Sequence, residues 1–139
     1  MTFKITKLDI RKANISINEA VFTGQKIKPA TTVKIGSLKL TEGTDYTVSY
    51  LNNINAGSAQ LTLTGKGKAE GAITKAFIIS KADIAEAQLN VKGVYSPAGT
   101  KLTVSGKYGE YQLGSGDSKI TDTALLPGKH KVTINGTGN

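Results

Sequence analysis

The chain repeats part of itself, and the repeat is out of phase with the chain ends. The opening segment, residues 2–10, returns with the same pattern as residues 76–84. The segment Thr-Leu-Thr-Gly-Lys-Gly at 62–67 returns as Thr-Ile-Asn-Gly-Thr-Gly at 133–138. A repeat of about 70 residues is too long for a solenoid and is typical of a small β domain. The sequence therefore predicts two related domains, 1–80 and 81–139, the second diverged or incomplete.

Alternating apolar and polar residues predict β-strands along most of the chain. Such runs occur at residues 3–5, 15–17, 33–35, 38–40, 46–50 and 61–64. Glycine-rich turn sequences separate them at roughly ten-residue spacing, which indicates an all-β sandwich or barrel. The most helix-like stretch, 81–89, aligns with residues 7–15, which are rich in β-branched side chains. We therefore expect a linker at both places, with at most one helical turn in the second copy.

The composition excludes several classes of function. The chain has no cysteine, so it forms no disulfide and offers no thiolate as nucleophile or metal ligand. No run of 18 apolar residues is present, so we expect no membrane insertion. The N-terminus lacks the apolar stretch of a signal peptide. We therefore expect either a complete small protein that begins at Met1 or a fragment of a longer secreted one.

The net charge of +8 comes almost entirely from lysine. Nucleic-acid sites favour arginine and interleaved aromatic residues, so we expect no specific nucleic-acid partner. Lys26, Lys28, Lys34 and Lys39 lie in or near alternating segments, where solvated strand faces and protected sheet edges explain them. The alternative is contact with an anionic cell-surface polysaccharide or a related anionic polymer.

The residues capable of chemistry do not form a recognisable catalytic set. His130 is the single histidine, and the carboxylates are dispersed along the chain. The Gly-Lys-Gly run at 65–67 lacks the spacing of a phosphate-binding loop, and we interpret it as a hairpin turn. Residues 114–118 lack calcium-loop spacing and are interpreted as a flexible loop. We expect no catalytic residue, no metal site, no cofactor and no enzyme activity.

Within the first copy, several short motifs occur in a familiar order. They are Phe22-Thr23-Gly24, Pro29, Leu40, the run Gly-Thr-Asp-Tyr-Thr-Val-Ser-Tyr at 43–50, Asn52-Asn53, Gly57-Ser58-Ala59 and Gly65-Lys66-Gly67. This series resembles the bacterial Ig-like modules of Gram-positive surface proteins, which also occur in phage structural proteins. The match covers residues 2–81 well and the rest in outline. Lys68-Ala69 departs from it, because such modules usually carry an aromatic residue there.

The resemblance implies tandem Ig-like β-sandwich modules with spacer, adhesion or decoration roles and no conserved chemistry. The residues agree with it. Asp45 is placed to cap the turn at 43–44 through local backbone hydrogen bonds. Alternate residues of 46–50 share one face, and the asparagines at 52–55 tolerate left-handed backbone.

The function that we expect is structural. The first hypothesis is a component that decorates a phage capsid or tail, located in the virion and exposed for weak surface attachment. The alternative is a fragment of a bacterial cell-surface adhesin or cell-wall protein, extracellular, that acts as a spacer or ligand-binding repeat. Both have protein partners, either further copies of the chain or other surface proteins.

The phase shift of the repeat suggests how such partners join. Phe3, Lys4 and Ile5 match the end of the first copy, and the second copy has no equivalent of that segment within residues 81–139. We therefore expect Phe3–Ile5 to add as a strand to the second module of a neighbouring copy. The alternatives are that this strand pairs within its own first module, or that the phase reflects where a repeat array was cut.

Overall fold

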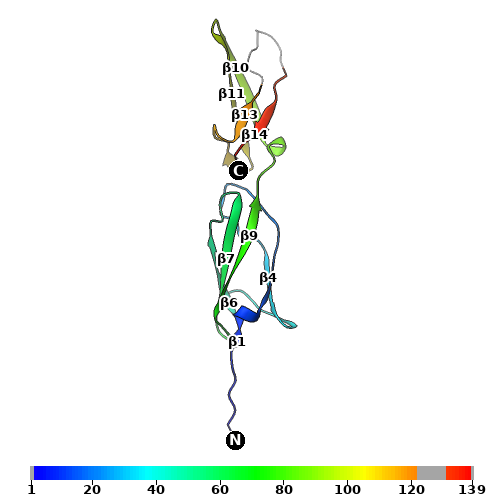
Figure 1. Cartoon of the computed structure of the whole chain (residues 1–139), viewed down its shortest axis with the longest axis vertical. Coiled ribbons are helices and arrows are strands. Elements are labelled where there is room, and N and C mark those ends of the chain that lie inside the picture. The colour runs from blue at the N-terminus through cyan, green and yellow to red at the C-terminus, as the bar shows by residue number, and fades with distance from the viewer. Residues whose placement is uncertain (1, 122–130, 139) are drawn as a thin grey trace. The chain divides into compact units, whose positions relative to one another are not determined.

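The computed structural model describes residues 2–121 and 131–138, which form β-strands and two single-turn 3-10 helices (Figure 1). These elements fall into two compact units. The first unit comprises Met1–Ala20 and Lys26–Ile79, and the second comprises Val21–Gln25 and Ser80–Asn139. The all-β prediction is confirmed. No helix in the described residues is long and apolar enough to cross a bilayer.

The strands of the first part of the chain form three sheets. The elements are β1 (Leu8–Asp9), η1 (Ile10–Lys12), β2 (Asn14–Ile17), β3 (Ala20–Val21), β4 (Thr31–Ile35), β5 (Leu38–Lys39), β6 (Tyr46–Leu51), β7 (Gly57–Gly65), β8 (Ala69–Glu70) and β9 (Ala72–Ser80). The sheet orders are β2-β4-β5, β3-β9-β7-β6 and the parallel pair β1-β8. Strand β7 is therefore flanked on both edges, by β6 and by β9.

The core of the first unit lies against the central strand β7. Leu61 and Leu63 of β7 are fully buried, as is Val33 of β4. Phe77 and Ile79 of β9 are buried too, and β9 pairs antiparallel with β7 over its length. Alternate residues of both strands point inward, as the period of two in the sequence requires.

Two buried polar residues hold the loops of this unit. The Thr41 amide donates to Asp45 Oδ2 over 2.9 Å, and the Lys66 amide donates to the Asp45 carbonyl over 2.8 Å. Asn52 has a left-handed backbone with φ of 57°, and the side chain of Asn53 donates to the Ile27 carbonyl. The predicted role of Asp45 in a turn is therefore confirmed. Left-handed backbone is confirmed at Asn52, but Asn53 and Asn55 do not adopt it.

Both linkers contain one 3-10 turn, η1 and η2 (Ile84–Glu86). We expected at most one turn, in the second copy, so the turn at η1 is a difference. Its cause is local: Asp9 accepts a hydrogen bond from the Arg11 amide, as Asp83 does from the Ala85 amide. An aspartate at the N-cap stabilises a turn whatever the propensity of the residues that follow.

The second unit is built around one long hairpin. Its elements after η2 are β10 (Gln88–Ser96), β11 (Gly99–Tyr108), β12 (Tyr111–Gln112), β13 (Ser118–Ile120) and β14 (Ile134–Gly136). The sheets are β10-β11-β12 and β13-β14. None of the described residues between 80 and 138 is buried, and the buried side chain grouped with this unit is Phe22, whose ring packs against Tyr111.

The N-terminal segment is not a strand. Residues 2–7 carry no strand pairing, although the alternation at Phe3–Ile5 predicts one. The chain enters its first sheet only at β1, which pairs with β8. In the first unit the edge of β7 that a segment such as Phe3–Ile5 could join is already covered by β9. The alternative that this strand pairs within its own module is therefore wrong for the described structure.

Candidate assembly site

The hairpin β13–β14 is the counterpart of β6–β7 in the first unit. In β6–β7 Thr47 lies opposite Thr64, and in β13–β14 Lys119 lies opposite Asn135. The turn contacts match as well. The Lys66 amide donates to the Asp45 carbonyl over 2.8 Å, and the Thr137 amide donates to the Asp117 carbonyl over 2.9 Å. Asp117 thus takes the place of Asp45.

This correspondence identifies the open edge of the second unit. We use the name open edge of β14 for the side of Ile134–Gly136 that faces away from β13, together with the three residues Lys131–Thr133 that lead into this strand. In the first unit the matching edge of β7 carries β9, whereas the described residues place no strand beside β14. Val132 and Ile134 are only half-buried, but their counterparts Leu61 and Leu63 are fully buried. The apolar face of β14 is therefore incompletely covered.

A cavity lies beside the open edge, at the end of β14. Its volume is about 270 Å³. It is lined by residues of the linker (Lys81–Ile84 and Ala87), by Tyr108, Leu113 and Asp117, and by Gly136–Gly138. In the first unit the residues matching Ala82 and Asp83 are Leu8 and Asp9, which pair with β8. The cavity therefore lies where the first unit holds β8.

The isoleucines at matching positions of the two linkers differ in how deeply they are buried. Ile10 of η1 is completely buried, whereas Ile84 of η2 is half-buried and lines the cavity. Gly65 shows the tight packing that β8 brings: a Cβ there would lie 2.6 Å from the backbone nitrogen of Glu70. At Gly136 the nearest atom to such a Cβ is the Ile84 side chain at 3.3 Å. The linker is therefore closely packed in the first unit, whereas in the second unit it borders a cavity.

The loop before β13 is held by Asp117 rather than being free. Its Oδ2 accepts a 2.7 Å hydrogen bond from the Gly114 amide and a 3.0 Å bond from the Tyr111 hydroxyl. This hydrogen bond to the carboxylate raises the pKa of Tyr111, and burial adds to the effect. The loop at 114–118, interpreted from its sequence as flexible, therefore has hydrogen bonds that anchor it at Asp117. The sequence does contain a signal for this anchored loop. Asp117 matches Asp45, because each precedes a strand whose partner strand ends in a Gly-x-Gly turn.

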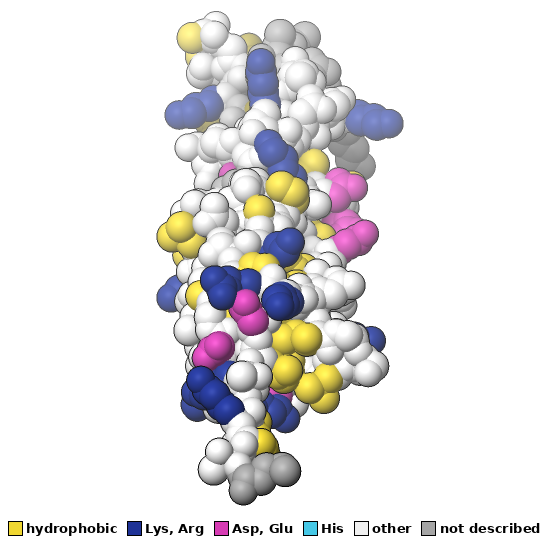
Figure 2. Space-filling model, turned by 60° about the horizontal axis from the view of Figure 1, so that its bottom comes forward, with side chains coloured by type: hydrophobic (Ala, Val, Ile, Leu, Met, Phe, Trp, Pro, Cys, Tyr) yellow, Lys and Arg dark blue, Asp and Glu magenta, His cyan; other side chains and the backbone are white. Residues whose placement is uncertain are grey.

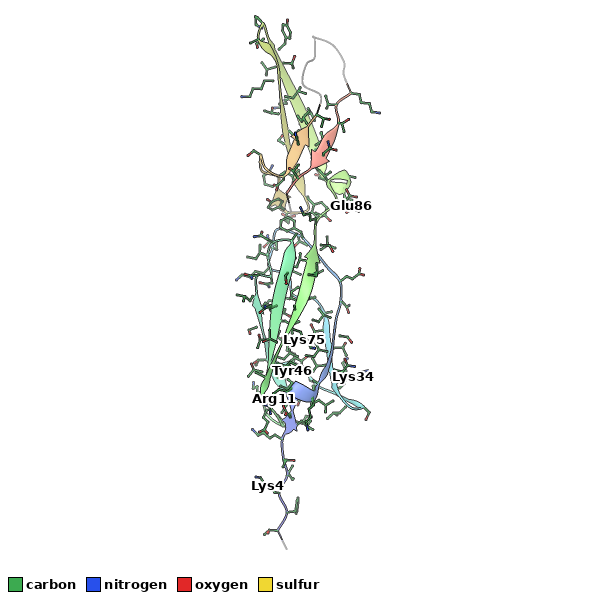
Figure 3. The ribbon with its side chains drawn as sticks, viewed as in Figure 1. Lys4, Arg11, Lys34, Tyr46, Lys75 and Glu86 are labelled. Carbon is green, nitrogen blue, oxygen red and sulfur yellow. The ribbon has the colours of Figure 1, made fainter. Side chains whose placement is uncertain are left out.

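The N-terminal segment Phe3–Ile5, which we call the donor segment, has no contacts that bury its side chains. Phe3 is 86% exposed and Ile5 is 83% exposed, although both are large apolar side chains. Figure 3 shows Lys4 on an extended piece of chain, clear of the strands of its own unit. The cost of leaving two such side chains in water is on the order of 3 kcal/mol or more. A partner that covers them gains that amount.

The four lysines proposed for anionic contacts do not form one cluster. Lys34 and Lys39 lie directly opposite each other on β4 and β5, and both are exposed. Lys26 and Lys28 flank Ile27, whose amide donates to the Asn53 carbonyl. Figure 2 shows lysine and arginine side chains scattered over the visible face. The pair Lys34 and Lys39 is the element of this prediction that the structure brings together.

Other ionisable groups are used within the fold. Asp9 makes two hydrogen bonds to the Arg11 side chain, and these lower the pKa of Asp9 and raise that of Arg11. Burial is the main cause that raises the pKa of Tyr46 and Tyr50. Burial also raises the pKa of Tyr108, helped by the Glu86 carboxylate that its hydroxyl contacts. The hydrogen bonds of Asp9 and Tyr108 therefore stabilise a turn and the end of a strand.

Two candidate features remain. His130 lies outside the described residues. In the part of the chain that the structure describes, no group of three or more histidine, cysteine or acidic residues is arranged to hold a metal ion. A second, polar cavity of about 470 Å³ lies in the loop Asn52–Ser58 of the first unit and is lined by its asparagines.

Comparison with protein-family models, with curated proteins and with solved structures finds no match to this chain.

Proposed function

We propose that the chain is a non-enzymatic structural and binding protein made of two Ig-like β-sandwich modules. The observation that carries this proposal is the use of its buried polar groups. Asp45 and Asn53 are the buried polar residues of the described chain, and both are engaged in holding loops. Asp117 has the same role in the second unit. Buried polar groups whose hydrogen bonds hold loops are typical of a scaffold rather than of a reaction centre.

The proposed setting is the surface of a phage particle, on its capsid or tail, where the modules attach weakly to an anionic polymer of the bacterial surface. The pair Lys34 and Lys39 supports this attachment. Like charges directly opposite on neighbouring strands repel each other, and an anion that contacts both removes the repulsion. The net charge of +8 adds long-range attraction.

Binding to purified Gram-positive cell walls tests the attachment. We expect sedimentation with the walls to weaken as salt rises, because salt screens exposed charges. The variant Lys34→Ala with Lys39→Ala should bind several-fold more weakly, whereas the matched exposed pair Lys92→Ala with Lys119→Ala should not. Equal binding by both variants would contradict the proposed contact. Detection of the chain in purified particles by mass spectrometry tests the location.

One observation favours the alternative, a repeat of a bacterial surface adhesin or cell-wall protein. Residues 2–8 match residues 76–82, which contain the end of β9 and the linker that follows it. In an array, the same segment would close a preceding module. A reading frame that continues past Asn139 into further copies of this pattern would support the adhesin over the particle.

A further inference from the structure

We propose that the open edge of β14 binds residues Thr2–Thr6 of a second copy of this chain, as an antiparallel strand on the side that β9 occupies in the first unit. The inference rests on the proposed structural role and names the partner within it. Its first support is the repeat. The segment 2–6 matches 76–80, and those residues form the end of the strand that covers the equivalent edge. The donor therefore has the apolar pattern of the end of β9, which in the first unit pairs with Gly57–Gln60.

The second support is that donor and acceptor each have an uncovered apolar face. Phe77 and Ile79 of β9 are buried against the first unit, whereas their counterparts Phe3 and Ile5 are exposed. On the acceptor, Val132 and Ile134 alternate with exposed residues and are only half-buried. Strand addition pairs the free backbone groups and buries both sets of side chains together.

A particular register brings these faces together. With Lys4 opposite Thr133, Phe3 lies opposite Ile134 and Ile5 lies opposite Val132. A shift of two residues would place Lys4 opposite Lys131, and like charges in that position repel each other. The register that copies β9 would place Thr2 opposite Lys131 and would leave the apolar residues Val132 and Ile134 uncovered. We therefore assign Lys4 to Thr133.

A second copy is the natural donor because of where the segment leaves its own unit. Residues 2–7 precede β1, which pairs with β8 immediately before β9 begins. The chain leaves β9 at its other end, Ser80, nine residues later. That strand spans about 30 Å, whereas the six residues 2–7 extend at most about 20 Å. The segment therefore leaves the first unit at the end away from Ser80, where a second copy can approach it.

The absence of cysteine permits a direct test. A chain carrying Lys4→Cys is mixed with a chain carrying Thr133→Cys, and the mixture is oxidised mildly. Directly opposite residues have Cβ atoms about 5 Å apart, which a disulfide spans after a small adjustment. Because each chain has one cysteine, a mixed disulfide joins two copies. Both positions are exposed, and circular dichroism of each reduced variant checks that it folds.

Matched controls use Asn135→Cys and Lys131→Cys, each mixed with Lys4→Cys. These positions share the face of Thr133 but are displaced by two residues, which puts the Cβ atoms about 7 Å apart. We expect the mixed disulfide with Thr133→Cys to form at least several-fold faster than with either control. Equal rates, a faster reaction with a control or no mixed disulfide would overturn the inference.

The outcomes separate this inference from the proposed function. A failed cross-link together with intact, lysine-dependent wall binding would remove the strand exchange and leave the surface role. A specific cross-link together with no binding to walls or particles would leave the strand exchange and remove that role. The variant Phe3→Ser with Ile5→Ser should raise the protein concentration needed for association by roughly a hundredfold, since it removes two apolar anchors.

Discussion

Asp45 and Asp117 show how one residue type fixes the same turn in two units of different completeness. Each accepts backbone hydrogen bonds that start a hairpin, and each carbonyl receives the amide of the paired Gly-x-Gly turn. Lys68 Nζ lies 3.4 Å from Asp45 Oδ1, an atom that accepts no hydrogen bond. Lys68 thus places a positive charge beside the buried carboxylate of Asp45.

Replacement of Asp45 tests its role in the first unit. Asp45→Ala should lower the free energy of unfolding by about 1–3 kcal/mol, because it leaves the Thr41 amide without its partner. Asp45→Asn keeps an acceptor oxygen and should cost less. Urea unfolding followed by circular dichroism measures both, with Glu19→Gln at an exposed position as control. A cost for Asp45→Ala no larger than that of the control would contradict this role.

The pair Asp9 and Arg11 gives a pH dependence. The pKa of Asp9 is below its ordinary value of 3.8 in the folded chain, so the unfolded chain binds the proton first as the pH falls. The stability that the pair provides is therefore present above about pH 3.8 and is lost as the pH falls through the lower, folded value. Arg11→Gln should make the fall in urea stability between pH 5 and pH 3 shallower. An unchanged slope would contradict the assignment.

At the scale of elements, the two linkers compare a packed and an unpacked copy of one structure. η1 packs against β7 and buries Ile10, whereas η2 borders a cavity and leaves Ile84 half exposed. Ile10→Ala should therefore cost about 2–5 kcal/mol, and Ile84→Ala should cost less than about 1 kcal/mol in a single copy. Thermal unfolding of the two variants at low concentration measures this. Equal costs would mean that the second unit is packed as well as the first.

The elements also show how far the sequence predicts the fold. Alternation predicted the strands of the first unit, and the turn residues placed its loops, because both depend on neighbours in sequence. The strand expected at Phe3–Ile5 does not form, and the edge of β7 that its repeat counterpart pairs with is occupied by β9. The long hairpin β10–β11 pairs Leu89 with Gly106, whereas Ile15 of the first copy pairs with Val33 across a longer connection. Pairing of that kind depends on loop length, which alternation does not report.

The candidate site was predicted in part. The repeat indicated a donor segment at Phe3–Ile5 and an incomplete second module. It did not indicate the cavity beside η2, because a cavity depends on which residues fail to pack in three dimensions. The lysines were predicted as a set of four, but strand register brings only Lys34 and Lys39 together.

At the scale of the whole molecule, one copy carries one donor segment and one acceptor edge. Such an interface is heterologous, so it produces a closed ring if the rotation between copies closes and an open chain of copies if it does not. The second unit, with no buried side chain between 80 and 138 in its described part, should gain most of its stability from this contact. The charge of +8 on each copy opposes association, so added salt should favour it.

The solution mass of the purified chain, measured by light scattering over a wide range of concentration, tests the central claim most directly. Strand exchange predicts a mass that rises with concentration to a defined oligomer or a growing polymer. It also predicts that Phe3→Ser with Ile5→Ser, at positions exposed in a single copy, suppresses the rise. A mass near 14.6 kDa at every concentration would contradict the account. So would an association that the double variant leaves unchanged.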